Sequence, residues 1–332
     1  MSCIVVDLGG TNLRCGIVSS DGELIYQERT RLHAGPGTRG ETFWEDIVST
    51  IVSFVADHEA ESGSHDPIVV AFPGPVRDDK AVGQAPTLVG PGIVPDIVAD
   101  IRSITGREVM MLNDVSAAAW YFERTLVADR FAVVTVSSGI GSKIFDRRGT
   151  GVIDDTSYAG EIGHLIVDAR DDAPTCDCGG QGHLGATASG RGFERIARRA
   201  AYSDAAGFLA SACVQVSGAT RASLNNEAHL VPAILAGDAW TTALLCASIA
   251  PLAQVLRTLT IGCGLQAVVV MGGFAQRIGS IYARELSAAL GSFSDCGAAC
   301  VNLQNFVTIV GAGEEPGLIG AARYAQQRLA RC

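Results

Sequence analysis

Apolar and polar positions follow one another in a regular order of predicted strands and helices through the first half of the chain. Short apolar runs and alternating segments predict strands, while apolar residues at every third or fourth position predict helices. The expected strands are residues 3–9, 12–20, 23–31, 67–76 and 108–114. The expected helices are residues 43–58, 93–106 and 115–126. Strands that alternate with helices indicate an α/β lobe.

The same order begins again after residue 126. Residues 131–145 read as a strand, a glycine-rich turn and a second strand, as residues 3–18 do. A helix at 245–262, a strand at 266–271 and a terminal helix at 315–330 follow. Residues 200–235 have weak periodicity and are predicted only as helices. We expect an N-terminal lobe of residues 1–112, completed by a helix at 315–332, and a second lobe of residues 113–314.

Composition allows two lobes with a large buried core. The chain has 332 residues, of which 48% are apolar and 18% charged. Its net charge of −10 comes without any block of lysine and arginine, which argues against nucleic acid as a partner. The longest apolar stretch, 244–273, is interrupted by Pro251 and Arg257, so we expect no membrane span. The N-terminal MSCIVVDLGG lacks the features of a secretory signal, and the ten scattered cysteines fit a reducing cytoplasm.

Glycine-rich turns follow three of the apolar strands. They are DLGGTN at 7–12, SSGIGS at 137–142 and MGGF at 271–274. Adjacent glycines let backbone N–H groups approach an anion, and Asp7 at a strand end could hold magnesium through water. A plain hairpin turn uses the same residues. Neither of the first two turns fits the P-loop or the dinucleotide-binding pattern. Three such turns in one chain favour a nucleotide site.

Asp114 comes where a buried strand ends and a helix begins, in LNDVSAAAW. Aspartate and asparagine both favour the N-cap of a helix, so a purely structural role is one interpretation. The other is a carboxylate at the carboxyl end of a strand, where open α/β sheets bind ligands. There it could accept a proton from an attacking hydroxyl.

Histidines and cysteines gather between residues 159 and 185. AGEIGHLIVD supplies Glu161 and His164, and CDCGGQGHLG supplies Cys176, Cys178 and His183. The two histidines and two cysteines make a set from which tetrahedral zinc sites are normally built. We expect a structural zinc in a loop of residues 164–183, since four protein ligands leave no open position. Two unligated thiols in a flexible loop are the alternative.

Taken together, the ordered motifs resemble the ROK family (repressors, open reading frames, kinases) of the actin-like ATPase superfamily. The motifs are DLGGTNLRCGIV, PGPV, LNDVSAAA, VSSGIGSKI, GEIGHLIVD, CDCGGQGH, VVVMGGF and GLIGAARYA. The resemblance implies an α/β, two-lobed actin-like ATPase (ribonuclease H-like) fold with a cleft between the lobes. It also implies an ATP- and Mg²⁺-dependent sugar kinase, with the last helix packed on the first lobe, that forms a homodimer or homotetramer.

By this resemblance Asp114 is the general base that deprotonates the acceptor hydroxyl. The implied substrate contacts are Gly74, Thr87, Asn113, Glu161 and His164. The implied phosphate and nucleotide contacts are Asp7, Gly9, Gly10, Thr11, Asn12, Ser138, Gly139, Gly141, Gly272 and Gly273. His164 carries two ring nitrogens and is open to a contact with metal, with substrate or with both.

The chain departs from the family pattern at positions that recognise the sugar. Gly185 stands where the sugar kinases have a glutamate, and Thr87 where they have an asparagine. His183 replaces the third cysteine of the zinc loop, and serines replace residues of the second phosphate turn. Since a site built for a hydroxyl discriminates by it, glucose is not the expected substrate. We expect a C7 cyclitol of the valiolone type, phosphorylated on its exocyclic CH2OH, with glucose or an N-acylated hexosamine as alternatives.

Two other classes of protein stay open. Transcriptional repressors of the family carry a DNA-binding helix-turn-helix ahead of DLGG, whereas here DLGG begins at residue 7 without a basic helix before it. A non-catalytic sugar-binding protein would be expected to lose its catalytic carboxylate. Retention of Asp114 therefore favours an enzyme.

Overall fold

The computed structural model describes residues 1–332 except 33–41, 64, 83, 86–87, 89, 150, 155, 157, 292–305, 312 and 331–332. Two compact units make up the chain. Unit 1 comprises Met1–Val127, Phe145–Ala159 and Glu315–Cys332, and unit 2 comprises Ala128–Ile144 and Gly160–Glu314. Unit 1 therefore continues beyond the expected boundary at residue 112 and includes the helix that follows it.

Unit 1 is built on a five-stranded sheet with the order β3-β2-β1-β4-β9. The strands are β1 (Cys3–Leu8), β2 (Asn12–Val18), β3 (Leu24–Arg31), β4 (Ile68–Phe72) and β9 (Val109–Asn113). The first three strands pair antiparallel, and β1, β4 and β9 run parallel. This mixed order arises because the hairpins lie at the N-terminal end, while β4 and β9 are reached through helices.

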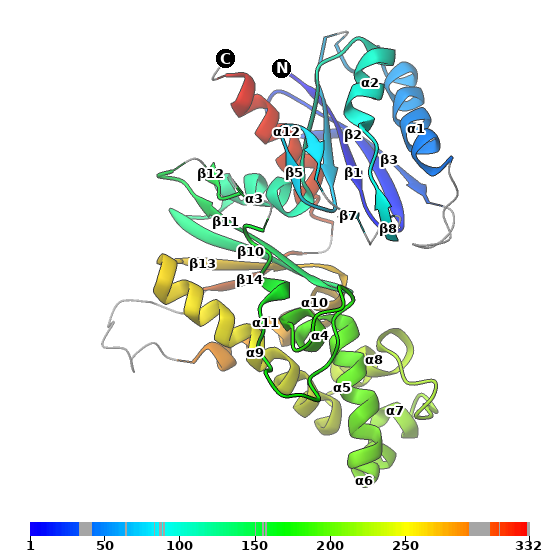
Figure 1. The fold of residues 1–332 in the computed structure, drawn as a ribbon, viewed down its shortest axis with the longest axis vertical. Coiled ribbons are helices and arrows are strands. Elements are labelled where there is room, and N and C mark those ends of the chain that lie inside the picture. The colour runs from blue at the N-terminus through cyan, green and yellow to red at the C-terminus, as the bar shows by residue number, and fades with distance from the viewer. Residues whose placement is uncertain are drawn as a thin grey trace. The chain divides into compact units, whose positions relative to one another are not determined.

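Helices cover both faces of this sheet (Figure 1). On one face α1 (Phe43–Asp57) and α2 (Ile97–Thr105) bury their apolar sides against alternate residues of the strands. On the other face lie α3 (Asp114–Thr125) and α12 (Pro316–Leu329). The two backbones approach closely, since a Cβ on Gly320 of α12 would lie 1.7 Å from the Ala117 carbonyl oxygen. The C-terminal helix thus packs on unit 1.

Short strands extend unit 1 beyond the main sheet. They are β5 (Val76–Arg77), β6 (Lys80–Ala81), β7 (Gln84–Ala85) and β8 (Gly90–Ile93). A further short strand of unit 1, β12 (Gly151–Val152), belongs to the second five-stranded sheet. The β5–β6 hairpin turns at Asp78 and Asp79, both with positive φ. The Asp79 carboxylate accepts two hydrogen bonds from Arg328 of α12, at 2.7 and 2.8 Å, which fixes this turn to the C-terminal helix. The sequence did not predict this hairpin, because an Asp-Asp turn lacks the usual glycine.

The second five-stranded sheet has the order β12-β11-β10-β13-β14. Its longer strands are β10 (Arg130–Val136), β11 (Ile140–Asp146), β13 (Ala267–Met271) and β14 (Val307–Ile309). Parallel pairing joins β10 to β13 and β13 to β14. The carboxyl ends of these three strands therefore meet at one edge.

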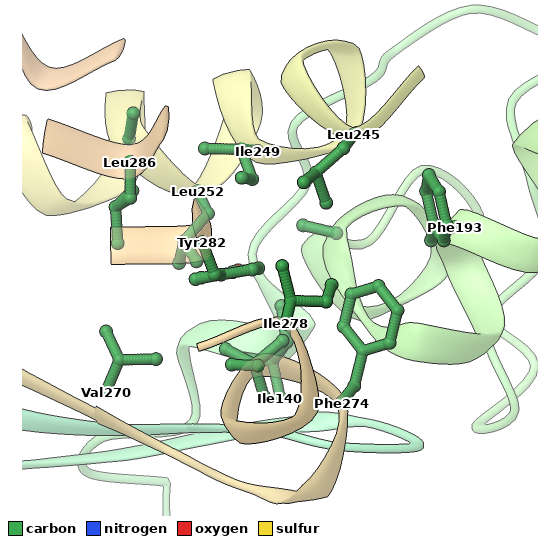
Figure 2. Packing of buried hydrophobic residues seen from close by; sticks show 14 of the residues in the cluster. Ile140, Phe193, Leu245, Ile249, Leu252, Val270, Phe274, Ile278, Tyr282 and Leu286 are labelled. Carbon is green, nitrogen blue, oxygen red and sulfur yellow. The ribbon is translucent and has the colours of Figure 1, made fainter. Parts of the chain in front are cut away.

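Helices make up most of the rest of unit 2. They are η1 (Ile162–His164), α4 (Leu184–Ala188), α5 (Gly190–Ser203), α6 (Ala205–Ala210), α7 (Ala212–Gln215), the π-helical turn η2 (Asn226–Leu230), α8 (Val231–Leu235), α9 (Ala239–Cys263), α10 (Gly273–Ile278) and α11 (Ser280–Leu290). Figure 2 shows how Leu252 of α9 and the fully buried Tyr282 of α11 pack in the core of this unit. The weak periodicity of residues 200–235 reflects short helices interrupted by the π-helical turn.

Among the described residues, α9 alone is long and apolar enough to cross a membrane by length and composition. Its most apolar window is 44% buried inside the protein. Leu245, Ile249 and Leu252 of this helix belong to the core of unit 2. A buried core helix passes the same test of length and composition, so this result is weak support for a membrane span.

Candidate active site

Parallel strands bring several of the expected site residues of unit 1 to one edge of its sheet. The register pairs Asp7 of β1 with Ala71 of β4, and Phe72 of β4 with Asn113 of β9. Asp7, the Gly74 turn and Asn113 therefore lie at the carboxyl ends of neighbouring strands, where open α/β sheets bind ligands. The glycine turn after β1 is closed by a 2.9 Å hydrogen bond from Gly9 N to Asn12 O.

Asp114 is the first residue of α3, and its neighbour Asn113 is the N-cap. Asp114 Oδ1 accepts hydrogen bonds from Val115 N, at 2.9 Å, and from Asn113 Nδ2, at 3.1 Å. The side chain is half-buried. The positive end of the helix dipole favours a carboxylate at this position. The sequence left open a helix cap or a carboxylate at the end of a strand. The structure contains both, since Asn113 is the cap and Asp114 is the carboxylate.

Asp7 is buried and paired with Arg14 of β2. The Arg14 guanidinium contacts the carboxylates of both Asp7 and Glu315, the residue that precedes α12. Burial alone would lower the pKa of Arg14, but the two carboxylates outweigh it and the pKa is raised. A carboxylate at this position has the oxygen donors that Mg²⁺ prefers, and the pairing with Arg14 suits contact through a bound water.

A polar cavity of about 460 Å³ lies beside Asn113 in unit 1. Ser116, Asp154 and Arg328 are among its lining residues, and Ser116 Oγ donates a hydrogen bond to Asp154 at 3.1 Å. The sequence pattern singled out none of these three residues. Asp114 is not part of this lining.

The second and third glycine turns of the sequence lie at the carboxyl ends of β10 and β13 in unit 2. A cavity of about 540 Å³ opens beside them, lined in part by Ser137, Ser138 and Gly273. The two glycines after β13 differ in what the fold requires of them. Gly272 has a φ of 98°, and a Cβ there would lie 2.7 Å from Val136 N. A Cβ on Gly273 would meet nothing within 4 Å, so its lack of a side chain leaves room for a ligand.

The far wall of this cavity consists of residues that the sequence pattern did not identify. Glu227 of η2 and Arg277 of α10 form an ion pair of 3.1 Å. Asn226 Nδ2 donates to the carbonyl of Gly190, at 2.7 Å, where α5 begins. The sequence analysis missed η2 because it is a π-helical turn in a region of weak periodicity, and the paired asparagines of ASLNNEAH are the local signal that could have indicated it. Such turns are frequent at functional sites.

Glu161 and His164 lie at η1 in unit 2, 4.0 Å apart between Oε2 and Nε2. Glycines on either side let this segment pack on β11. A Cβ on Gly160 would lie 2.1 Å from the Ser142 carbonyl oxygen, and one on Gly163 would lie 2.2 Å from that of Ile140. Backbone packing on β11 therefore requires the two glycines of the Gly-Glu-Ile-Gly-His segment.

The four expected metal ligands come together in unit 2. One ligand atom from each of His164, Cys176, Cys178 and His183 lies within 4.8 Å of all the others. Cys178 Sγ is 3.2 Å from His183 Nδ1, and the two imidazole rings are perpendicular at 5.4 Å. Burial raises the pKa of the Cys176 thiol, so a bound cation would be needed to hold it as thiolate. The donor set and the spacing fit tetrahedral zinc.

Of the remaining expected contacts, Gly74 lies in the turn after β4, where its N–H donates to Phe72 O at 2.9 Å. Ser138, Gly139 and Gly141 lie in or next to the turn after β10, and Gly190 N donates to Ser137 O of that turn at 2.8 Å. Thr87 falls outside the described residues.

Known proteins resemble this chain along nearly its whole length. The model of the ROK family matches residues 3–328. A C(7)-cyclitol 7-kinase from Streptomyces hygroscopicus subsp. jinggangensis (strain 5008) is 35% identical over 338 residues, covering 98% of this chain and 94% of that protein. An N-acetylmannosamine kinase from Escherichia coli O127:H6 (strain E2348/69 / EPEC) is 29% identical over 204 residues, covering 60% of this chain and 65% of that protein.

Solved structures share the fold. A ROK family glucokinase from Streptomyces griseus, in complex with glucose and AMPPNP, has a TM-score of 0.73 at 23% identity and covers 98% of this chain and 100% of its own. A ROK hexokinase from Thermus thermophilus has a TM-score of 0.74 at 23% identity, with both chains fully covered. The expected actin-like ATPase fold is confirmed. Motifs, fold and relatives agree, and the chain belongs to the ROK family.

Proposed function

We propose that this chain is an ATP-dependent kinase that phosphorylates the exocyclic CH2OH group of a C7 cyclitol. The observation that carries the proposal is the 35% identity to a C(7)-cyclitol 7-kinase over 98% of the chain. The placement of Asp114 at a strand end and helix N-terminus supports a kinase, since a carboxylate there suits proton abstraction. An N-acylhexosamine kinase is the alternative, with a relative that aligns over 60% of the chain.

In the proposed reaction Asp114 accepts the proton of the acceptor hydroxyl. The hydroxyl oxygen forms a bond to the γ-phosphorus, the bond from that phosphorus to the bridging oxygen breaks, and ADP leaves. Little covalent chemistry falls to the protein in such a transfer, so positioning and charge neutralisation supply most of the rate. Magnesium, when bound with ATP, neutralises charge on the phosphates.

The proposed contacts with magnesium, phosphates, adenosine and acceptor come from residues of both units. In unit 1, Asp7 and the turn from Gly9 to Asn12 contact magnesium and phosphates. In unit 2, the turn from Ser138 to Gly141 contacts phosphates, Gly273 lies by the adenosine, and Glu161 and His164 contact acceptor hydroxyls. Backbone N–H groups of glycine turns suit contact with phosphate oxygens.

Gly185 supports a cyclitol over glucose as acceptor. It is the second residue of α4 and has no side chain to bond a hydroxyl near an anomeric centre. A C7 cyclitol has a ring carbon in place of the ring oxygen of a hexose and therefore has no anomeric centre. Loss of one hydroxyl-binding group lowers the penalty against such an acceptor.

We further propose a structural zinc at Cys176, Cys178, His164 and His183, a homodimer or homotetramer, and a cytoplasmic location. The mutual spacing of the ligand atoms supports the zinc. Light scattering of the purified protein tests the oligomeric state, and a single monomer mass would contradict it.

An acceptor panel tests the proposed function. ADP release from ATP is measured with C7 cyclitols, glucose and other hexoses, and N-acetylated hexosamines. We expect the highest kcat/KM with a C7 cyclitol of the valiolone type, and at least about a 10³-fold lower kcat in Asp114→Asn, the loss of a general base. A higher kcat/KM for glucose would overturn the substrate, and full activity of Asp114→Asn would overturn the general base.

A further inference from the structure

Lysine is rare in this chain, and one of its lysines is buried. Of the 25 lysine and arginine residues, only Lys80 and Lys143 are lysines. Lys80 lies on the surface in β6, where its ammonium group pairs with Asp96 at 2.6 Å. Lys143 lies in β11, and only 4% of it is exposed. Lysine is almost never fully buried unless its charge is paired. A buried lysine in a chain that otherwise relies on arginine indicates a specific function for its ammonium group.

Lys143 follows the glycine turn that is proposed to bind phosphates. Side chains alternate between the two faces of a strand. Ile140 and Ile144 pack into the core of unit 2, so Gly141 and Lys143 lie on the opposite face of β11. Lys143 is the only basic residue between positions 131 and 146. The strand that leaves the turn therefore carries one cation, on the same face as Gly141.

The stem of Lys143 lies against the residue that precedes the proposed acceptor contacts. A Cβ placed on Gly160 would be 3.2 Å from Lys143 Cδ and 2.1 Å from the Ser142 carbonyl oxygen. The Ser142 hydroxyl donates to the Gly160 carbonyl at 2.7 Å and so holds this segment on β11. Glu161 is the next residue along the chain. Lys143 therefore lies between the phosphate turn and the start of the segment that is proposed to bind the acceptor.

We infer that Lys143 is a further catalytic residue, whose ammonium group contacts the γ-phosphoryl group of ATP during transfer. This inference rests on the nucleotide and acceptor contacts of the proposed function. In these, adenosine lies by Gly273, the phosphates lie along the turn from Ser138 to Gly141, and an acceptor hydroxyl lies at Glu161. The phosphoryl group passes from the turn to the acceptor, and Lys143 is placed between the two.

A lysine at this position suits phosphoryl transfer. Its compact ammonium group binds phosphate oxygens as a point charge. Negative charge is spread over the three equatorial oxygens of the group in transfer, and a cation already in place there stabilises the transition state. Since the side chain is enclosed, little water screens this attraction. Lys143 supplies charge and transfers no proton, because the proton of the acceptor hydroxyl goes to Asp114.

Nucleotide affinity separates this role from a structural one. Lys143→Met removes the charge and keeps a side chain of similar length. Binding of ADP and of the β,γ-imido analogue of ATP, each with Mg²⁺, is measured by calorimetry without acceptor. We expect the analogue to bind at least about tenfold more weakly than to wild type, since a hydrogen bond to a charged group is lost. ADP should bind within about twofold of wild type, because it has no γ-phosphoryl group. Lys80→Met, which removes the exposed lysine, should bind both nucleotides as wild type does.

Turnover gives a second readout. With the best acceptor of the panel, kcat of Lys143→Met should fall by about 10²- to 10³-fold, the effect of removing one electrostatic contact to a transition state. Acceptor affinity measured without ATP should stay within about twofold of wild type. Lys80→Met should keep full kcat. All assays are run at temperatures where melting curves show each variant to be folded, so a loss of structure is not mistaken for a loss of rate.

Affinity labelling tests the placement of Lys143 in wild type, without any substitution. The probe is an adenosine polyphosphate with a pyridoxal group on its terminal phosphate. Its aldehyde condenses with a lysine amine with loss of water, and borohydride reduces the imine to a stable amine. Mass spectrometry then distinguishes the two lysines. We expect label on Lys143 that excess ATP prevents, and little label on Lys80.

The results that would overturn the inference differ from those that would overturn the proposed function. Equal losses of ADP and analogue affinity in folded Lys143→Met would exclude a specific contact with the γ-phosphoryl group. Unchanged affinity and kcat would leave Lys143 with a structural role, and label on Lys80 alone would place Lys143 away from the phosphates. A wild type that prefers glucose would overturn the proposed acceptor alone, because nucleotide binding and labelling do not depend on the acceptor. A wild type that binds neither nucleotide would overturn both.

Discussion

Gly185 lies against the backbone of Gly163, such that a Cβ atom placed on Gly185 would be 3.3 Å from the Gly163 carbonyl oxygen. Gly163 is the middle residue of η1, between Glu161 and His164. The position at which sugar kinases of the family have a glutamate is therefore next to the turn that carries two proposed acceptor contacts. A side chain added at Gly185 would therefore begin beside η1.

Gly185→Glu is expected to change the preferred acceptor. A carboxylate at this position can bond a hydroxyl near an anomeric centre, so kcat/KM for glucose should rise relative to that for the C7 cyclitol by at least about tenfold. Gly185→Ala is the matched control, because it adds the same Cβ without the carboxylate. The ratio of the two kcat/KM values is measured for all three proteins. An equal ratio in the glutamate and alanine variants would remove Gly185 from the account of specificity.

Gly139→Ala tests the phosphate turn after β10. A Cβ on Gly139 would meet no heavy atom within 4 Å, and its φ is not positive, so the melting temperature should stay unchanged. A methyl group beside backbone N–H groups that bind a phosphate should raise KM for ATP by about tenfold. Gly262→Ala, where a Cβ would likewise meet nothing, is the control. Equal KM values for ATP in these two variants would mean that the turn does not bind phosphate.

The sequence predicted the parts of the site that follow directly from strands. The apolar runs that become β1, β9, β10 and β13 are each followed by a glycine turn or by Asn113-Asp114. Such a pattern places a motif at the carboxyl end of a strand without knowledge of the fold. The adjacent carboxyl ends of β1, β4 and β9 then follow from their parallel pairing.

Features that depend on contacts between distant segments were not predictable. The Arg328 guanidinium bonds Asp79 across 249 positions of the chain, and nothing in either local sequence indicates the pair. The hydrogen bond from Asn113 Nδ2 to the Gly74 carbonyl is similar, because it joins positions 39 apart in the chain. The cavity wall at Glu227 and Arg277 was missed because a π-helical turn breaks the 3.6-residue period.

Arg14→Met is expected to destabilise unit 1. It removes the guanidinium between Asp7 and Glu315 and leaves two partly buried carboxylates close together. We expect the free energy of unfolding to fall by about 1–3 kcal/mol, less than for a fully buried pair, because these side chains keep some contact with water. Urea unfolding measures the loss. Arg29→Met is the control, since Arg29 is the exposed cross-strand partner of Arg14, and an equal loss there would contradict the role of the pair.

Zinc removal is expected to loosen the loop between His164 and His183. Metal analysis of the purified protein should find one zinc per chain, and Cys178→Ser should reduce both zinc content and melting temperature. Incubation with a strong chelator should do the same to wild type and zinc should reverse it, because metal binding stabilises the folded loop. Cys263→Ser, at a cysteine outside the cluster, is the control. A zinc content far below one per chain would remove the metal from the proposal.

Two buried thiols of unit 1 should make stability depend on alkaline pH. Burial, followed by the Asp66 carboxylate, raises the pKa of Cys3 to about 12, and burial, followed by Glu28, raises that of Cys15 to about 12. A thiol of the unfolded chain has a pKa of about 8.5. The contribution of the two protonated thiols to the stability of the folded state is therefore complete below that pH and is lost as pH rises toward 12. We expect the melting temperature to fall between about pH 9 and 11.

Cys15→Ala should reduce this dependence of the melting temperature on pH. At pH 8, maleimide should label the exposed Cys246 well before Cys3 or Cys15. Rapid labelling of Cys3 or Cys15 in the native protein would contradict their burial.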